Sequence, residues 1–295
     1  MPDTRTQALR GHAAMLLFSI LVAGSFSLGS IAAPMIDPTA LTALRFLVAA
    51  AVIGTLVLFG PGFKREYIHA PWRYVLLGGL FATYFVLMFE GLKTAPAIST
   101  SAVFTLTPVM SAGFGWLLLR QITTPRMALA LTMAAAGAVW VIFRGDIEAI
   151  LAFNIGTGET IFFVGCIAHA LYTPLVRKLY RGEPQLVFTL GVLIAGFIIL
   201  SILGAKEIVA TDWIALPSIV WITILYLSVF ASATTFVLLQ YAALRLPSAK
   251  VMAYTYLVPA WVIIWEAFMG NGLVGITVLA GVAVIIIALL MLLKD

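Results

Sequence analysis

Ten stretches of about 20 mostly apolar residues follow one another along the chain, and the segments between them are short and carry Gly, Pro or charge. A helix needs about 20 residues to cross the hydrocarbon core of a bilayer, which is about 30 Å thick. Backbone polar groups in lipid must be satisfied within their own segment, and these runs are too long for barrel strands. The sequence therefore predicts an all-α integral membrane protein with ten transmembrane helices. The predicted spans are residues 12–31, 39–60, 72–92, 96–119, 125–143, 158–179, 185–204, 216–241, 247–269 and 272–293.

The composition supports the same class. Of 295 residues, 63% are hydrophobic and 10% are charged, whereas a soluble domain carries about 25% charged residues. So few charges cannot cover a water-facing surface, and no connection is long enough for a second, soluble domain. The first apolar run precedes "GSIAAP", which resembles a signal-peptide cleavage site. That run is long for a signal core and its removal would leave nine spans, so we expect it to remain.

Lys and Arg are sorted between the two sides of the predicted membrane. Thirteen of the 17, including Lys294, fall on the side of the N-terminus, and the other side has Lys93, Arg144 and Lys206, with Arg45 inside the second span. Positive charge accumulates on the cytoplasmic side, so both termini are predicted to be cytoplasmic. The basic residues stand in ones and twos between apolar runs, which is unlike a nucleic-acid-binding face.

Two proline-punctuated stretches, one in each half of the chain, indicate a repeat. "GLKTAPAISTSAVFTLTPVM" contains Pro96 and Pro108, and "ALRLPSAKVMAYTYLVPAW" contains Pro247 and Pro259, each 151 positions later. Five spans per half reverse the direction of the second copy. The sequence thus predicts two inverted five-helix repeats, residues 1–150 and 151–295, an arrangement from which many secondary transporters build two alternating states.

The paired prolines have a predicted mechanical role. Pro96 and Pro247 fall where a helix begins, where a missing N–H costs little. Pro108 and Pro259 fall inside their spans, where each frees the carbonyl four residues earlier and bends or softens the helix. We expect the second pair to act as gating hinges; the alternative is that both are static packing features.

The stretches "APAISTSAVFTLTPVMSAGFGWLLL" and "LPSAKVMAYTYLVPAWVIIWEAFMGN" resemble the fourth and ninth helices of the drug/metabolite transporter superfamily, in its EamA-type ten-span branch. "FATYFVLMFEGLKTA" and "FVGCIAHALYT" resemble the YddG-like exporters of aromatic amino acids. The resemblance implies an exporter in the bacterial inner membrane, with span six facing the substrate and spans two and seven outside the cavity. Family members end helices four and nine with Gly-Glu. This chain has Arg120-Gln121 and Met269-Gly270-Asn271 there, so a proton-coupling role for that glutamate is not carried over.

Polar and adaptable side chains at membrane depth mark a candidate substrate cavity, because such groups usually face a cavity or a partner. His169 in span six shares a helical face with Thr173, and a neutral imidazole can hydrogen-bond a substrate. In span three Tyr84 lies one turn from Met88. Thr235 in span eight is the repeat partner of Tyr84. Each is also compatible with a structural role between helices.

Further candidates lie on spans four and nine. Ser99 and Val103 share one face, with Lys250 and Tyr254 as repeat partners. Lys250 is either a lysine that extends to the interface or the cation that a carboxylate first meets from the cytoplasm. Arg45 and Glu266 lie too deep in the predicted membrane for their charged groups to reach the interface easily, and either could pair with a residue of another span.

These features predict a secondary transporter that exports small organic solutes, namely amino acids (threonine, methionine, aromatic) or related metabolites, by alternating access. A multidrug or lipophilic-cation exporter and a passive solute channel remain alternatives. Nucleotide, zincin and hydrolase motifs are missing, so we expect no enzyme activity, catalytic residue or cofactor. The single Cys166 and three histidines without ligand spacing predict no metal site. Expected partners are a small-molecule substrate and membrane lipid, without nucleic acid, and the expected state is a monomer.

Overall fold

The computed structural model describes residues 4–152, 155–272 and 274–293, so Lys294 lies outside the described residues. All regular structure in these ranges is helical. The first half comprises α1 Thr4–Ala32, α2 Pro38–Phe59, η1 Arg65–Ile68, α3 Trp72–Leu92, α4 Ala97–Phe104, α5 Thr107–Leu119, α6 Pro125–Ile142 and α7 Ile147–Leu151. The second half comprises α8 Thr157–Leu179, α9 Gln185–Leu203, α10 Ala205–Ala210, α11 Ser218–Ser228, η2 Val229–Thr234, α12 Thr235–Ala243, α13 Ser248–Met252, η3 Ala253–Leu257, α14 Val258–Phe268 and α15 Ile276–Leu293.

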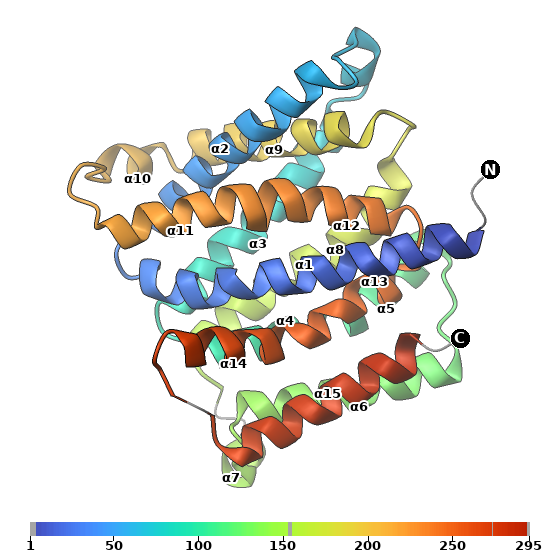
Figure 1. The fold of residues 1–295 in the computed structure, drawn as a ribbon, viewed down its shortest axis with the longest axis vertical. Coiled ribbons are helices and arrows are strands. Elements are labelled where there is room, and N and C mark those ends of the chain that lie inside the picture. Colours follow the sequence, from blue (N-terminus) through green and yellow to red (C-terminus); the bar gives the residue numbers. More distant parts are fainter. Residues whose placement is uncertain (1–3, 153–154, 273, 294–295) are drawn as a thin grey trace.

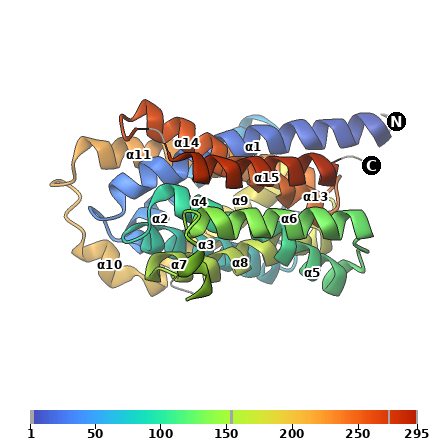
Figure 2. The ribbon, with the colours of Figure 1, turned by 90° about the horizontal axis from the view of Figure 1, so that it is seen from below.

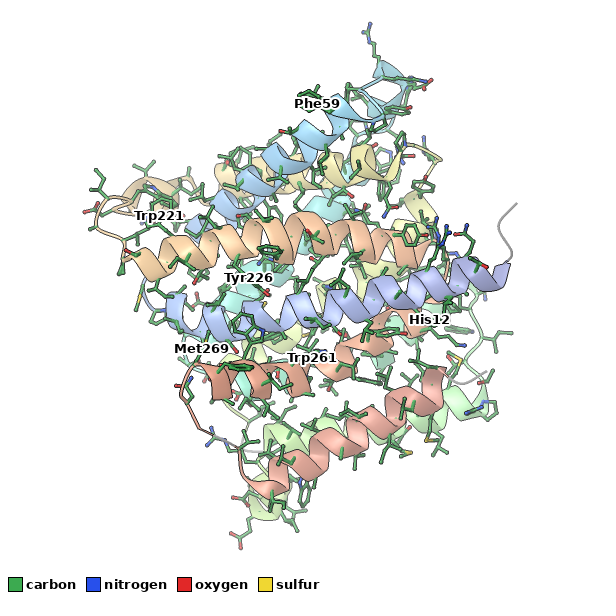
Figure 3. The ribbon with its side chains drawn as sticks, in the orientation of Figure 1. His12, Phe59, Trp221, Tyr226, Trp261 and Met269 are labelled. Carbon is green, nitrogen blue, oxygen red and sulfur yellow. The ribbon has the colours of Figure 1, made fainter. Side chains whose placement is uncertain are left out.

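Ten helices within the described ranges are long and apolar enough to cross a membrane, which confirms the predicted spans. The first candidate span starts at Thr6 within α1, earlier than the predicted 12, because the polar residues before the apolar run continue the same helix. Large apolar side chains cover the outside; Phe59, for example, is 90% exposed (Figure 3). Such a surface suits lipid rather than water.

The spans form a central group flanked by two pairs (Figure 1). α2 lies beside α9 at one edge, and α6 lies beside α15 at the opposite edge. Between them lie α1, α3, α8 and the three interrupted spans α4–α5, α11–α12 and α13–α14. Both chain ends are at the same end of the bundle (Figure 2). We call this the terminal end, and the opposite end, which carries α7 and α10, the far end.

Proline marks where several spans begin. α4 starts immediately after Pro96 and α13 immediately after Pro247, as predicted. α2 has Pro38 in its first turn, and the Asp37 carboxylate accepts hydrogen bonds from the backbone N–H of Thr39 (2.8 Å) and Ala40. The first turn of a helix has free N–H groups, so proline removes a donor that has no intrahelical partner, and a carboxylate satisfies those that remain.

The fourth span is interrupted just before its internal proline. α4 ends at Phe104, and α5 begins at Thr107, with Pro108 in its first turn. Because Pro108 has no N–H, the Phe104 carbonyl loses its helical donor. The Thr107 hydroxyl donates to that carbonyl instead, at 2.7 Å. The predicted softening at Pro108 therefore corresponds to a break with a side-chain cap.

The ninth span changes geometry at the matching place. The tighter 3-10 turn η3 occupies Ala253–Leu257 and precedes Pro259. Pro259 has no N–H to donate to the Thr255 carbonyl, which accepts a hydrogen bond from the backbone N–H of Val258 instead. The two interruptions also touch, since the Thr107 and Thr255 hydroxyl oxygens lie 3.3 Å apart. Each proline thus interrupts its helix, and the two interruptions meet inside the bundle.

α3 and α8 cross with their backbones in close contact at the far end. The crossing is made by Gly91 and Gly158; a Cβ built on Gly91 would lie 2.6 Å from the Gly158 carbonyl oxygen. A Cβ on Gly158 would likewise overlap the Gly91 carbonyl. Small residues permit this kind of approach between membrane helices, so both positions require glycine.

A buried ion pair ties helix ends together at the terminal end. Arg73, at the start of α3, places Nη1 2.8 Å from Glu183 Oε1 in the connection after α8, and both side chains are almost fully buried. Arg73 also donates to the Leu179 carbonyl at 2.6 Å. Burial, with the Glu183 carboxylate, raises the pKa of Tyr180, and the Tyr180 hydroxyl donates to the Glu183 carbonyl at 2.7 Å.

Candidate functional site

A small cavity lies in the middle of the bundle, between α1, α3, α8, η2 and α12. Its volume is about 10 Å³, which holds at most about one water molecule. The cavity is therefore contracted in this structure and would have to widen to admit an organic solute. The lining residues are Phe18, Val22, Ser25, Phe81, Tyr84, Phe85, Met88, His169, Ala231 and Thr235.

His169 presents the most polar group of this lining. It is 1% exposed and is surrounded by rings, with centroid distances of 4.5 Å to Tyr84, 5.2 Å to Phe104 and 5.3 Å to Phe81. Its Nδ1 has no hydrogen-bond partner among the described residues, and neither has the hydroxyl of Ser25. Buried polar atoms are usually paired, so two unpaired atoms around one cavity indicate a place for a polar ligand.

The structure brings four of the predicted site residues together, because Tyr84, Met88, His169 and Thr235 all line this cavity. The other candidates lie elsewhere. Val103 is buried in the main hydrophobic cluster, and Lys250 occupies the short α13 at the terminal end. Ser99 and Tyr254 lie toward opposite ends of the bundle, and Pro108 and Pro259 lie at the helix interruptions.

Sequence reasoning missed the contribution of α1. Phe18, Val22 and Ser25 point into the cavity from one face of this helix. They stand at i, i+4 and i+7 within "FSILVAGSF". That helical spacing was the available signal, since residues so spaced share one face.

Hydrogen bonds from two neighbouring helices fix the position of α1 (Figure 3). From α11, the Tyr226 hydroxyl donates to the Leu21 carbonyl at 2.8 Å. From α14, Trp261 Nε1 donates to the Ser19 hydroxyl at 3.2 Å. These bonds tie α1 to α11 and α14, while its stripe of Phe18, Val22 and Ser25 is directed at the cavity.

Aromatic rings close the far end of the cavity. Phe26, Phe104 and Phe162, from three different helices, have ring centroids 5.8 to 6.3 Å apart. Beyond them, the Ser99 hydroxyl donates to Glu159 Oε1 at 2.6 Å and joins α4 to α8. The Glu159 carboxylate is buried, so this bond satisfies a group that would be costly to leave unpaired.

Polar contacts between helices close the terminal end. They connect α8, the consecutive elements α12, α13 and η3, and α1. The contacts are Gln240 to Tyr172 (2.9 Å), Thr173 to Met252 Sδ (3.1 Å) and Tyr254 to His12 Nδ1 (3.1 Å). With both ends closed, the cavity is occluded.

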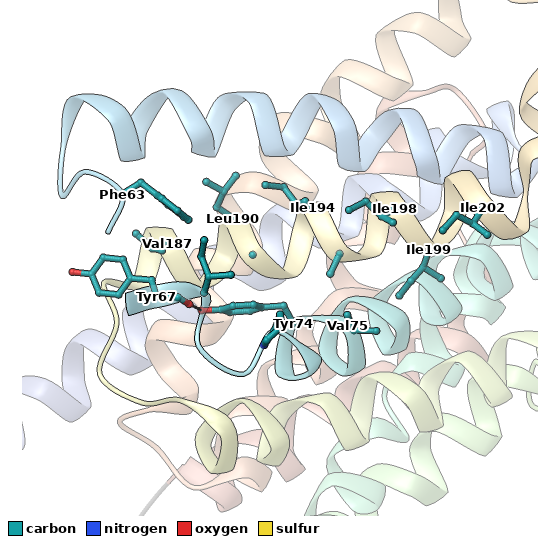
Figure 4. A pocket seen from close by; sticks show the side chains of 14 residues that line it. Phe63, Tyr67, Tyr74, Val75, Val187, Leu190, Ile194, Ile198, Ile199 and Ile202 are labelled. Carbon is teal, nitrogen blue, oxygen red and sulfur yellow. Dashed lines mark hydrogen bonds between the residues drawn. The ribbon is translucent and has the colours of Figure 1, made fainter. Parts of the chain in front are cut away.

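A larger hollow, about 480 Å³, lies on the outside between α3, α9 and the η1 segment (Figure 4). Its walls are aliphatic and aromatic, for example Leu190, Ile194 and Ile198. The Tyr74 hydroxyl donates to the Tyr67 carbonyl at 2.8 Å and is thereby satisfied. An apolar groove on a lipid-facing surface suits a hydrocarbon chain and offers little to a polar solute, so the central cavity is the candidate transport site.

Comparison with known proteins agrees with a transport fold. The model of the EamA-like transporter family matches residues 9–143 and again residues 156–294. The chain belongs to the EamA-like transporter family. With ten spans, this EamA-like protein is a multi-pass membrane protein.

Relatives and a solved structure cover nearly the whole EamA-like chain. An uncharacterized transporter, YyaM of Bacillus subtilis (strain 168), is 26% identical over 278 residues, 92% of this chain and 90% of its own. An uncharacterized transporter of Archaeoglobus fulgidus is 26% identical over 88% of this chain and 89% of its own. A solved structure titled "Crystal structure of protein" has a TM-score of 0.74 at 20% identity, covering 98% of this chain and 97% of its own, and supports the fold.

One departure from the EamA-type pattern has a visible structural role. Gln121 stands where the resembling helices carry glutamate, and its Oε1 accepts the backbone N–H of Ser248 at 3.0 Å. Arg120 adopts a left-handed conformation (φ 56°) and ends α5, which turns Gln121 back toward α13. The amide thus caps the start of the ninth span.

Proposed function

We propose that this protein is a secondary transporter that exports small organic solutes, amino acids or related metabolites, by alternating access around the central cavity. The observation that carries the proposal is an occluded cavity with unpaired polar atoms of His169 and Ser25 inside it. A substrate site at the centre of the bundle, closed toward both ends, is what a carrier needs between its two open states. A passive channel would have a continuous path instead.

The proposed mechanism uses residues 1–150 and 151–295 as inverted repeats. The double family match and the interruptions before Pro108 and Pro259 support this division. Following the bias of Lys and Arg, the terminal end faces the cytoplasm, in a bacterial inner membrane. Opening to the cytoplasm then separates contacts such as Tyr254 to His12, and opening to the other side separates Ser99 from Glu159.

A second candidate cargo is a lipophilic cation. Its support is the group of rings around the cavity, since Phe81, Tyr84 and Phe104 all lie within 5.3 Å of His169 between ring centroids. The faces of aromatic rings attract organic cations. Aromatic amino acids would use the same rings by stacking, so the cargo must be decided by transport measurements.

The test is counterflow in proteoliposomes. Vesicles are loaded with unlabelled amino acids, and uptake of labelled threonine, methionine and phenylalanine is followed at fixed pH without an ion gradient. Saturable uptake that depends on internal cargo is expected. Uptake that does not saturate would indicate a channel. If tetraphenylphosphonium is exchanged but no amino acid is, the transported solute is a lipophilic cation.

Replacing Pro108 or Pro259 with alanine is expected to slow exchange by about 3- to 10-fold, with half-saturation changed by less than about twofold. Alanine restores an N–H to the interrupted helix, and one added backbone hydrogen bond stabilises the straight form by about 0.5–1.5 kcal/mol. A stiffer hinge raises the barrier between states without altering the cavity. The measurement is counterflow rate against external concentration.

Pro96 and Pro247 supply matched controls, because each precedes its helix and alanine there restores no intrahelical bond. Pro96→Ala and Pro247→Ala should exchange at close to the wild-type rate. Equal loss of rate in all four variants would assign the prolines to folding rather than to gating.

A further inference from the structure

Arg45 is a fully buried cation in the membrane-spanning part of the protein. It lies seven residues into α2, roughly 10 Å along the helix from Pro38, at the edge of the bundle, yet its side chain reaches the central helices. Its Nε donates to the Ser232 hydroxyl and its Nη2 to the Ala231 carbonyl, both at 2.5 Å. The guanidinium also stacks on the Phe85 ring, 3.6 Å from the centroid.

These partners are all neutral. Nη1 of Arg45 has no hydrogen-bond partner among the described residues, and Arg45 takes part in none of the ion pairs found there. The other deeply buried arginine, Arg73, is paired with the Glu183 carboxylate. Burying a charge without an opposite charge is costly, and such groups within a membrane usually serve function. The structure thus holds a cation that lacks an anion.

The guanidinium is adjacent to the cavity. Two groups that hold it, the Phe85 ring and Ala231, are also part of the cavity lining. Ala231 lies in η2, a π-helical turn in the middle of the eighth span. Such wide turns are rare and often occur at functional sites; here the turn directs a mid-span carbonyl at Arg45. One layer of side chains therefore separates the charge from the space where cargo would lie.

We propose that Arg45 is the anion subsite of the cavity and binds the carboxylate of the transported solute. Widening of the cavity brings Nη1 into contact with a carboxylate, which supplies the missing opposite charge. The cargo is then a zwitterion or an organic acid, and a solute that carries only positive charge is disfavoured. This inference rests on the proposed function, because it takes the cavity as the substrate site.

The test uses three compounds with one phenyl ring and different charges: L-phenylalanine, 3-phenylpropionate and phenethylamine. Each is titrated against purified protein in nanodiscs, and the apparent dissociation constant is read from the rise in melting temperature. A hydrogen-bonded charge pair in a buried site predicts that phenylalanine and 3-phenylpropionate bind at least about 10-fold more tightly than phenethylamine. In Arg45→Gln this preference should disappear.

Arg45→Met is the second variant, because an apolar side chain of similar length removes the cost of a buried charge and keeps the protein folded. It should melt at or above the wild-type temperature and show no preference for the carboxylates. If neither variant folds, the titrations of the three compounds against the wild-type protein still test whether the site prefers carboxylates. Phenethylamine binding as tightly as 3-phenylpropionate, failure of all three compounds to bind, or an unchanged preference in a folded variant overturns the proposal.

The same compounds separate this inference from the proposed function. If carboxylates bind through Arg45 but do not undergo counterflow, the anion subsite is supported and the proposed carrier function is contradicted. If phenethylamine undergoes saturable counterflow in preference to both carboxylates, the proposed carrier function is supported and the anion subsite is contradicted.

Discussion

Replacing His169 with alanine is expected to lower saturable solute exchange by roughly 10- to 100-fold while the protein stays folded in the membrane. His169 lines the cavity, and its Nδ1 is unpaired in the occluded form. A polar solute that entered would pair with it, and removal of the imidazole leaves that solute group buried without a partner. Leaving a buried polar group unpaired costs about 1–3 kcal/mol of binding free energy, and each 1.4 kcal/mol changes an equilibrium constant tenfold. The measurement is the initial rate of counterflow.

Two variants define the controls for this prediction. His69→Ala removes an exposed imidazole outside the spans and should exchange at the wild-type rate. His169→Gln retains hydrogen-bonding groups and should recover part of the activity. A normal rate in His169→Ala would remove the imidazole from the transport site, and loss of folded protein would assign it to packing.

Replacing Gly158 with leucine is expected to abolish the folded protein. A Cβ at this position overlaps the Gly91 carbonyl and lies 2.6 Å from the Thr94 hydroxyl and 2.7 Å from the Ala95 Cβ. The carbonyl belongs to the α3 backbone and cannot move aside unless the two helices separate. Overpacking in a core typically costs about 1–3 kcal/mol even where side chains can adjust, and separation of α3 from α8 costs more. Gel filtration and thermal melting in detergent measure the outcome.

Gly113→Leu is the matched control, since a Cβ on Gly113, also within a membrane helix, meets nothing within 4 Å. This variant should elute and melt like the wild type. If Gly158→Leu does the same, the close crossing of α3 and α8 is not required for folding.

The number and limits of the spans are predictable because lipid imposes a minimum length and because proline and charge mark the ends. The break before Pro108 was predictable too, since it depends on a missing N–H four residues after a carbonyl. The π-helical turn at Val229–Thr234 was not, because that stretch carries no proline and the Arg45 side chain that its Ala231 carbonyl meets comes from a distant helix.

The candidate site was predictable in part. Tyr84 and His169 stand out in the sequence because polar groups are rare at membrane depth. Ser99 lies at the far end because it stands in the first turn of α4, but its bond to Glu159, 60 residues later, was not predictable. The role of Arg45 depends on a partner 187 residues away, Ser232. Pairings over such separations follow from helix packing, which a single sequence does not reveal.

The contact between the Thr107 and Thr255 hydroxyls has a consequence for the tightness of the transporter. Each threonine belongs to the interruption of one span, so bending of one interruption acts on the other through this contact. In the proposed alternating-access mechanism, motion that opens one end is coupled through this contact to motion that closes the other. A state open at both ends, through which protons and ions would leak and dissipate the membrane potential, requires this contact to part. In that mechanism, two hydroxyls at the centre of the bundle help keep the membrane sealed while cargo crosses it.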